Sequence, residues 1–157
     1  MKINIVCVGK IKERFYTEAC KEYIKRLQKF CNVTIIETAE NTVYKIPNEA
    51  QTEELLKAEA EDYKKYLKGH IIVLDIDGKA MDSENLSSYI KNKKTEGISE
   101  ITFLIGSSYG ISKNTREKAD LRLSFSQMTF PHQLFRVMLL EQIYRAFMIE
   151  NNRTYHK

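Results

Sequence analysis

Segments rich in β-branched residues alternate with segments whose apolar residues recur every three or four positions, and this alternation restricts the fold more than any other feature. We expect strands at residues 3–9, 32–38, 70–75, 100–105 and 121–125. We expect helices at residues 13–29, 49–67, 83–92, 114–119 and 131–149. Asp82 or Ser83 should cap the third helix, and a turn at Asp77-Gly78 should close the third strand. The pattern predicts an α/β fold with a mostly parallel sheet and helices on both faces.

The length of the chain, 157 residues, is that of one ordinary domain, and no linker or repeat interrupts it. We therefore expect a single domain over residues 1–157. No run of about 18 apolar residues occurs, so no membrane span is expected. The N-terminal apolar run is short and lacks a small-residue cleavage site, which favours a first strand over a signal peptide. We therefore expect a cytoplasmic location.

Cysteine usage agrees with a reducing compartment. Cys7, Cys20 and Cys31 are odd in number and form no C-x-x-C pair. This pattern predicts three reduced thiols that pack in the core, without a disulfide. Because zinc sites use closely spaced ligand pairs, no metal site is expected.

Charge is distributed unevenly along the chain, whose net charge is +4. Residues 1–110 carry equal numbers of basic and acidic side chains, so the whole excess lies in residues 111–157. Such asymmetry favours a polyanionic partner such as nucleic acid. A solvated basic face is the alternative.

The last predicted helix carries apolar side chains around nearly its whole circumference. A helix of this kind is buried on all sides, whereas the last helix of a small α/β domain usually has a solvent face. A second copy of the chain could supply the missing cover, so we expect a homodimer. Cover by the N-terminal elements of the same chain is the alternative. The apolar residues are Leu134, Phe135, Val137, Met138, Leu139, Leu140, Ile143, Tyr144, Ala146, Phe147, Met148 and Ile149.

Three segments that follow predicted strands, at residues 74–78, 105–110 and 125–130, are candidates for a binding site. Ligands of open α/β sheets bind outside the carboxyl ends of the strands. The segments offer glycines, free backbone amides, small hydroxyls and apolar walls, which suit an adenosine-sized ligand. Neither a Walker loop nor G-x-G-x-x-G is present. A plain strand-to-helix turn at residues 106–110 is the alternative.

Several polar residues allow two interpretations each. Asp75 and Asp77 could serve a metal or act as a base, although two such residues before a glycine more often form a turn. His132 could contact a ligand or stabilise the start of the last helix. Glu141 and Arg145, four positions apart, could pair within that helix. The C-terminal tail could be frayed, or its aromatic and cationic residues could stack on a base and meet phosphate.

The run LSFSQMTFPHQLFRVMLLEQIYRAFMI at residues 123–149, together with the terminal Tyr155-His156-Lys157, resembles the ribosomal RNA large subunit methyltransferase H family. These are small knotted methyltransferases of the SPOUT class. The resemblance extends over essentially the whole chain and includes residues 5–10, the Leu74-Asp75 strand end and the Gly106 loop.

The resemblance implies an α/β domain with a deep trefoil knot near the C-terminus. It also implies a homodimer that binds S-adenosylmethionine in the knot and methylates N3 of a pseudouridine in 23S ribosomal RNA of assembled ribosomes. The cofactor-binding positions would be Leu74, Gly106, Phe125, Ser126, Gln127, Met128, Thr129 and Phe130. The groups that position the base and the RNA, or take part in catalysis, would be Arg136, Arg145, Tyr155, His156 and Lys157.

The chain departs from the family pattern at two positions. Ser107 stands where the family loop commonly has a second glycine, and a positive φ there would strain a serine and weaken cofactor binding. Thr154 stands where relatives often have a proline. A protein of the same fold that assists ribosome assembly or binds RNA without catalysis is therefore an alternative. A small α/β hydrolase or nucleotide-binding enzyme is a third, disfavoured because no nucleophile elbow or Walker motif occurs.

Overall fold

The computed structural model of the chain describes residues 1–41 and 46–153. The strands are β1 (Lys2–Val8), β2 (Asn32–Thr38), β3 (His70–Ala80), β4 (Glu100–Ile105) and β5 (Leu121–Ser124). The helices are α1 (Arg14–Leu27), α2 (Glu49–Tyr63), the 3-10 turn η1 (Lys64–Tyr66), α3 (Ser83–Thr95), α4 (Lys113–Lys118) and α5 (His132–Glu150). The predicted alternation of strands and helices is confirmed.

One five-stranded sheet with the order β2-β1-β4-β3-β5 organises these elements, and every paired strand is parallel. The inner strands β1 and β4 are buried on both faces, from Ile3 to Val8 and from Ile101 to Ile105. A strand of this kind requires a near-continuous apolar sequence, and both strands have one.

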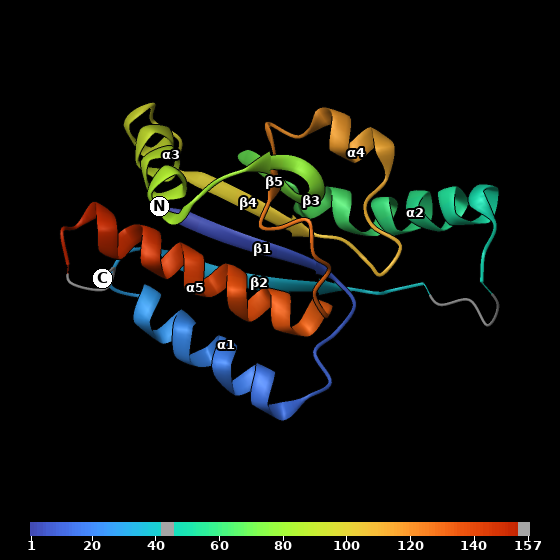
Figure 1. The fold of residues 1–157 in the computed structure, drawn as a ribbon, viewed down its shortest axis with the longest axis horizontal. Helices are drawn as coiled ribbons and strands as arrows, with labels where there is room; N and C mark the ends of the chain where they lie inside the picture. Colours follow the sequence, from blue (N-terminus) through green and yellow to red (C-terminus); the bar gives the residue numbers. More distant parts are fainter. Residues whose placement is uncertain (42–45, 154–157) are drawn as a thin grey trace.

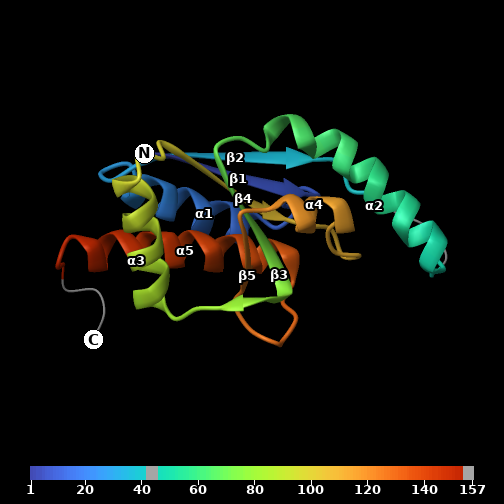
Figure 2. The ribbon, with the colours of Figure 1, turned by 90° about the horizontal axis from the view of Figure 1, so that it is seen from above.

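Helices cover the two faces of the sheet as predicted (Figures 1 and 2). Helices α1, α3 and α5 lie on one face, and α2 and α4 lie on the other. The larger apolar core lies under α5 and includes Ile5, Phe103, Leu139 and Phe147. A smaller core under α2 contains Val6, Val8, Tyr63, Val73, Leu104 and Ile111.

Side-chain caps explain where two of the helices begin. Asn48 accepts a hydrogen bond from the Gln51 backbone amide, and the Gln51 side chain accepts one from the Asn48 amide, which completes a capping box for α2. Asp82, one of the two predicted caps, accepts from the Asn85 amide at 2.7 Å and starts α3.

Strand β3 differs from the prediction, because it does not end at Asp77-Gly78 but continues to Ala80. Its pairing with β5 shifts register between Leu74 and Lys79. A Cβ atom at Gly78 would lie 2.7 Å from the carbonyl carbon and oxygen of Arg122, so only glycine allows β5 to approach this closely. Asp77 and Gly78, which were predicted to form a turn, therefore belong to β3, and Gly78 allows β5 to pack closely against it.

Helix α5 buries one side, with Leu139, Leu140 and Ile143 at 0% exposure. Helix α1 covers part of another side, where the rings of Tyr23 and Tyr144 lie 6.2 Å apart. The N-terminal alternative is therefore confirmed for that part. Other apolar residues of α5, among them Val137 and Met138, stay half-buried in the single chain. The homodimer stays a prediction.

The three cysteines are buried and unpaired with one another. Burial raises the pKa of the Cys7 thiol to about 12 and that of the Cys31 thiol to about 11. Among residues 1–41 and 46–153, no group of three or more His, Cys, Asp or Glu side chains is arranged to hold a metal ion. Within the same residues, no helix combines the length and the apolar character needed to cross a membrane.

Candidate functional site

The three strand-end segments singled out in the sequence meet at the carboxyl ends of β3, β4 and β5. Together with the start of α5 they enclose a cavity of about 470 Å³, within the range of small-molecule sites. Aromatic side chains form one wall, because the ring of Phe135 packs 5.0 Å from that of Phe125 and 6.0 Å from that of Phe130. The site is therefore concave, and its aromatic wall is accompanied by polar side chains, among them Asp75, Arg116 and His132.

All the predicted cofactor residues line this cavity except Gln127. The Gln127 side chain instead donates a hydrogen bond to the Ile76 carbonyl at 3.1 Å, which holds residues 125–130 against β3. Within that segment the Met128 amide donates to the Ser126 hydroxyl at 3.0 Å. Gln127 thus supports the wall of the cavity without facing into it.

The loop at residues 106–110 is a tight turn in which side chains have little room. Ser107 and Gly110 exchange two backbone hydrogen bonds of 3.1 and 2.9 Å. A Cβ atom at Gly106 would lie 2.2 Å from the Gly110 carbonyl oxygen, and Gly110 has a φ of +101°. Both positions therefore require glycine.

The expected strain at Ser107 is absent. Among the described residues, Asn152 is the only non-glycine residue with a positive φ. Ser107 is 3% exposed, so its hydroxyl lies inside the protein. The departure from the glycine pair therefore costs no backbone strain, and that objection to cofactor binding is removed.

His132 lies half-buried at the start of α5 and lines the cavity. Burial lowers the pKa of its imidazole, while Glu40 and a hydrogen bond that the ring donates to the Gly106 backbone oppose this shift. The ring is therefore mainly neutral at pH 7. Glu40 also accepts hydrogen bonds from the Ser108 amide and hydroxyl at 3.3 and 3.1 Å, so it fixes the loop from outside.

Asp75 is held by arginines. Its carboxylate lies 2.8 and 2.9 Å from two nitrogens of Arg122 and 3.8 Å from Arg116. The Asp77 amide donates to Asp75 at 3.2 Å, a local contact typical of an Asx turn. The structure favours this structural role over the metal or general-base interpretation.

Comparison with known proteins assigns the fold to a family. The family model described as "Predicted SPOUT methyltransferase" matches residues 1–156. The chain belongs to the SPOUT methyltransferase family. Proteins named "Ribosomal RNA large subunit methyltransferase H" from Clostridium botulinum and Fusobacterium nucleatum are 47% and 44% identical to this SPOUT methyltransferase, with full coverage of both chains in each comparison.

Solved structures agree with the fold of this SPOUT methyltransferase. A methylase-family protein from Haemophilus influenzae has a TM-score of 0.55 at 11% identity, over 99% of this chain and 70% of that chain. A Legionella pneumophila methyltransferase, solved with bound S-adenosylmethionine, has a TM-score of 0.50 at 11% identity, over 94% of this chain and 66% of that chain. The trefoil knot stays a prediction.

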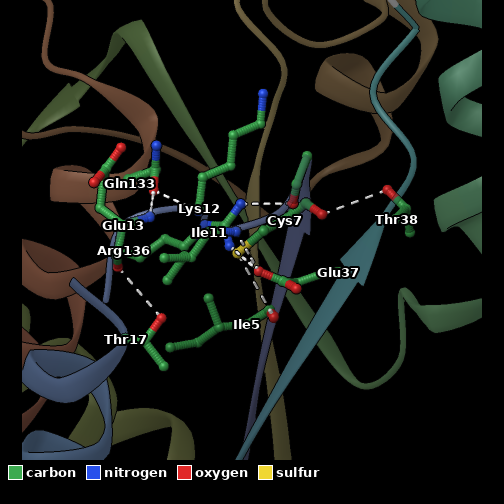
Figure 3. A network of polar contacts seen from close by, with 11 residues as sticks. Ile5, Cys7, Ile11, Lys12, Glu13, Thr17, Glu37, Thr38, Gln133 and Arg136 are labelled. Carbon is green, nitrogen blue, oxygen red and sulfur yellow. Dashed lines mark hydrogen bonds and ion pairs between the residues drawn. The ribbon is translucent and has the colours of Figure 1, made fainter. Parts of the chain in front are cut away.

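Arg136 differs from its expected role at an RNA surface. It is 1% exposed, and its guanidinium pairs with Glu37 (Figure 3). It also donates a hydrogen bond to the Gly9 carbonyl at 2.6 Å. One turn earlier, the Gln133 side chain accepts from the Lys12 backbone amide at 2.7 Å. In this SPOUT methyltransferase Arg136 is therefore an internal anchor between α5 and the ends of β1 and β2.

Arg145 forms the predicted pair within α5, with nitrogens 2.6 and 3.0 Å from a Glu141 oxygen. The Glu141 and Arg145 side chains are 18% and 25% exposed, so the pair is partly accessible in the single chain. The predicted tail residues Tyr155, His156 and Lys157 lie outside the described residues.

Glu59, which is 1% exposed and lies on the buried side of α2 in this SPOUT methyltransferase, was not predicted from the sequence. A signal for it was present, because Leu55, Glu59 and Tyr63 follow one another at four-residue spacing on the buried stripe of α2. A carboxyl on such a stripe needs a polar partner, which periodicity alone cannot identify.

Proposed function

We propose that the chain is an S-adenosylmethionine-dependent methyltransferase of ribosomal RNA, and that it methylates N3 of a pseudouridine in 23S RNA of the assembled ribosome. Relatives that are 42–47% identical over their full length, named as large subunit ribosomal RNA methyltransferases, support the substrate class. The observation that carries the proposal is the gathering of the predicted cofactor positions around one cavity.

The residues of the cavity fit the cofactor. Gly106 lines the cavity and carries no side chain, because its turn leaves no room for a Cβ atom. Leu74, Phe125 and Phe130 would supply apolar walls for an adenine ring, and the backbone of residues 126–129 would supply polar contacts. A neutral His132 adds no positive charge that would repel a sulfonium.

When bound, S-adenosylmethionine supplies a methyl group activated by its sulfonium. The chain's contribution is to hold the pseudouridine in line with that group, an effect worth at most about 7–11 kcal/mol. The imide N3 must give up its proton, and the bond that it would then form to the methyl carbon replaces the bond of that carbon to sulfur. In our proposal Arg145 and the tail residues Tyr155, His156 and Lys157 favour the deprotonated base and contact phosphate, with His156 as the candidate proton acceptor.

A homodimer is part of the proposal. The half-buried residues Val137 and Met138 of α5 line a second hollow with Tyr23 and Met81, and a second copy would cover it. Sedimentation at micromolar concentration should show a dimer. Replacing Met138 with lysine should shift it to monomer, because an ammonium group would have to be desolvated in the interface. A wild-type protein that sediments only as a monomer contradicts this part.

The activity is tested by tritium transfer from labelled S-adenosylmethionine to ribosomes that lack the modification, with free 23S RNA as the comparison. We expect label on intact ribosomes at one pseudouridine. We also expect the protein to lie in the cytoplasm, together with the ribosomes. Cofactor binding without label would indicate that the enzyme methylates a different substrate. Absence of both cofactor binding and label would favour the alternative that the protein binds RNA without catalysis. The ground for that alternative was strain at Ser107, and Ser107 is not strained.

A further inference from the structure

Arg116 is the only lysine or arginine among the described residues that line the candidate cofactor cavity. It lies on α4, and 35% of its side chain is exposed. His132, the other basic residue of the lining, has a pKa that burial lowers. Within the described part of the chain, Arg116 therefore carries the permanent positive charge of the cavity.

The guanidinium of Arg116 has donors that no hydrogen bond within residues 1–41 and 46–153 takes up. Its Nε atom is buried and has no partner there. Its Nη1 atom lies 3.8 Å from an oxygen of Asp75, which is beyond hydrogen-bond distance. A planar guanidinium with unused donors is suited to bind a carboxylate through two parallel hydrogen bonds.

Asp75 does not need these donors, because Arg122 supplies others. The Nε and Nη2 atoms of Arg122 lie 2.9 and 2.8 Å from Oδ2 of Asp75, and Oδ1 accepts the Asp77 backbone amide at 3.2 Å. Arg116 can therefore turn toward a ligand without leaving a buried carboxylate unpaired.

A buried chain of hydroxyl groups fixes the helix that carries Arg116. The Ser112 side chain caps α4 by accepting from the Thr115 amide at 3.3 Å. The Thr115 hydroxyl lies 2.8 Å from that of Ser112 and 3.0 Å from that of Tyr63 on α2, which is 1% exposed. The position of Arg116 is thus set before a ligand binds, which lowers the entropic cost of binding.

The cationic and aromatic parts of the cavity come from opposite faces of the sheet. Helix α4 lies on one face with α2, whereas α5, which carries Phe135 of the aromatic wall, lies on the other (Figures 1 and 2). S-adenosylmethionine has an adenine ring at one end and an amino-acid group at the other. The carboxylate of that group is the only anionic group of the cofactor.

We propose that Arg116 binds the carboxylate of the methionyl group of S-adenosylmethionine. The inference rests on the proposed function, since it needs the cavity to bind this cofactor. The sulfonium and its methyl group lie between the adenine and the carboxylate in the covalent structure. An arginine at one end and an aromatic wall at the other would therefore fix the methyl group between them.

An RNA phosphate is the alternative anion, because Arg116 also borders a surface hollow beside β5. The charge of this hollow does not favour it. Four basic side chains there face three acidic ones, whereas RNA-binding surfaces have a clear excess of basic residues. The acidic residues are Asp77, Glu117 and Asp120.

The test measures Kd by calorimetric titration of the full chain with S-adenosylmethionine and with its decarboxylated form, which lacks only the carboxylate. The wild type should bind the decarboxylated form about tenfold more weakly, the size of one hydrogen bond to a charged group. Arg116→Met should weaken the binding of S-adenosylmethionine by about the same factor and should not weaken that of the decarboxylated form. Arg116→Lys should fall between, because an ammonium keeps the charge without the planar fork.

Lys118→Met is the matched control, because it removes one positive charge from the same helix at an exposed position outside the cavity lining. It should bind both ligands as the wild type does. Equal weakening of both ligands by Arg116→Met would indicate a disturbed cavity and overturn the inference. Unchanged binding of S-adenosylmethionine by Arg116→Met would also overturn it and would leave RNA as the partner to test.

A wild-type protein that binds neither ligand would overturn the proposed function and, with it, this inference. Equal affinity of the wild type for the two ligands would overturn the inference alone. If Arg116→Met fails to fold, Arg116→Lys decides the matter, because wild-type affinity for S-adenosylmethionine in that variant would overturn the inference.

Discussion

Arg136 donates a hydrogen bond to the carbonyl oxygen of Gly9 at 2.6 Å, across 127 positions of sequence. Gly9 follows β1 directly and has a φ of +91°, so its carbonyl is turned by a conformation that suits glycine. The same guanidinium pairs with Glu37 near the end of β2 (Figure 3). This one side chain therefore ties the last helix to the two first strands at the edge where the candidate site lies.

Arg136→Ala should lower the free energy of unfolding by about 3 kcal/mol, because it leaves Glu37 and the Gly9 carbonyl without their buried partner. Urea unfolding at pH 7 measures the change. Arg14→Ala is the control, since the Arg14–Glu18 pair is exposed and should contribute less than about 1 kcal/mol. Equal losses for both variants would contradict the anchor role.

Gly106→Ala should weaken cofactor binding by about tenfold or more, because the new Cβ atom would lie 2.2 Å from the Gly110 carbonyl oxygen and the turn must move. Calorimetric titration measures the loss. Gly97→Ala is the matched control: its φ of +87° makes alanine unfavourable, but no atom lies within 4 Å of the added carbon and Gly97 does not line the cavity. Wild-type affinity in Gly106→Ala would remove the loop from the site.

Glu59→Gln should change how stability depends on pH. Burial raises the pKa of Glu59, with Glu40 and Asp62 adding to the rise and Ser107 and the Asn41 backbone opposing it. The folded state therefore holds the proton more tightly. The contribution of Glu59 to the free energy of unfolding is largest at pH values below its pKa in the unfolded chain, about 4.3. This contribution is lost as the pH rises through the pKa of the folded state.

Glutamine cannot ionise, so the Tm of Glu59→Gln relative to wild type should increase between pH 4 and pH 8. Circular dichroism at several pH values measures it. The lowered pKa values of His70 and His132 act in the opposite direction but are common to both proteins, so they cancel in the difference. Glu54→Gln should show no such trend, and an identical pH slope for Glu59→Gln would refute the prediction.

Deleting Tyr155, His156 and Lys157 should abolish transfer of methyl groups to ribosomes and leave the Kd of the cofactor unchanged. The reason is chemical: the aromatic ring and the cationic groups of the tail suit a base and phosphates. The predicted cofactor positions that line the cavity belong to other segments, at the strand ends. Tritium transfer and titration on the same preparation separate the two effects. Full activity of the shortened chain would assign RNA positioning to other residues.

Local patterns predicted the elements well. The strands at residues 32–38 and 100–105 were predicted with the bounds that the structure has, because short β-branched runs between helical segments have few other conformations. Strand β3 was predicted too short, since its last residues are extended only by pairing with β5. Asp77-Gly78 has the composition of a turn, and no local signal shows that another strand passes over the glycine.

The candidate site also has a part that the sequence predicted and a part that it did not. Small and apolar residues after three strands were sufficient to predict the cavity, because parallel strands bring their carboxyl ends to one edge. The role of Arg136 was not predictable. An arginine in a basic segment suggests RNA, and only the packing of α5 shows that its charge is enclosed and paired.

The order of strands and helices, the faces they bury and the edge at which a ligand would bind follow from local periodicity and from the geometry of parallel sheets, so the amino-acid pattern predicts them. Which polar side chains are enclosed, and what they contact, depends on the three-dimensional packing. Gly9 and Arg136 are distant in the chain, as are Asn41 and Glu59. Their hydrogen bonds depend on how the layers pack, and that packing is not encoded in any local pattern.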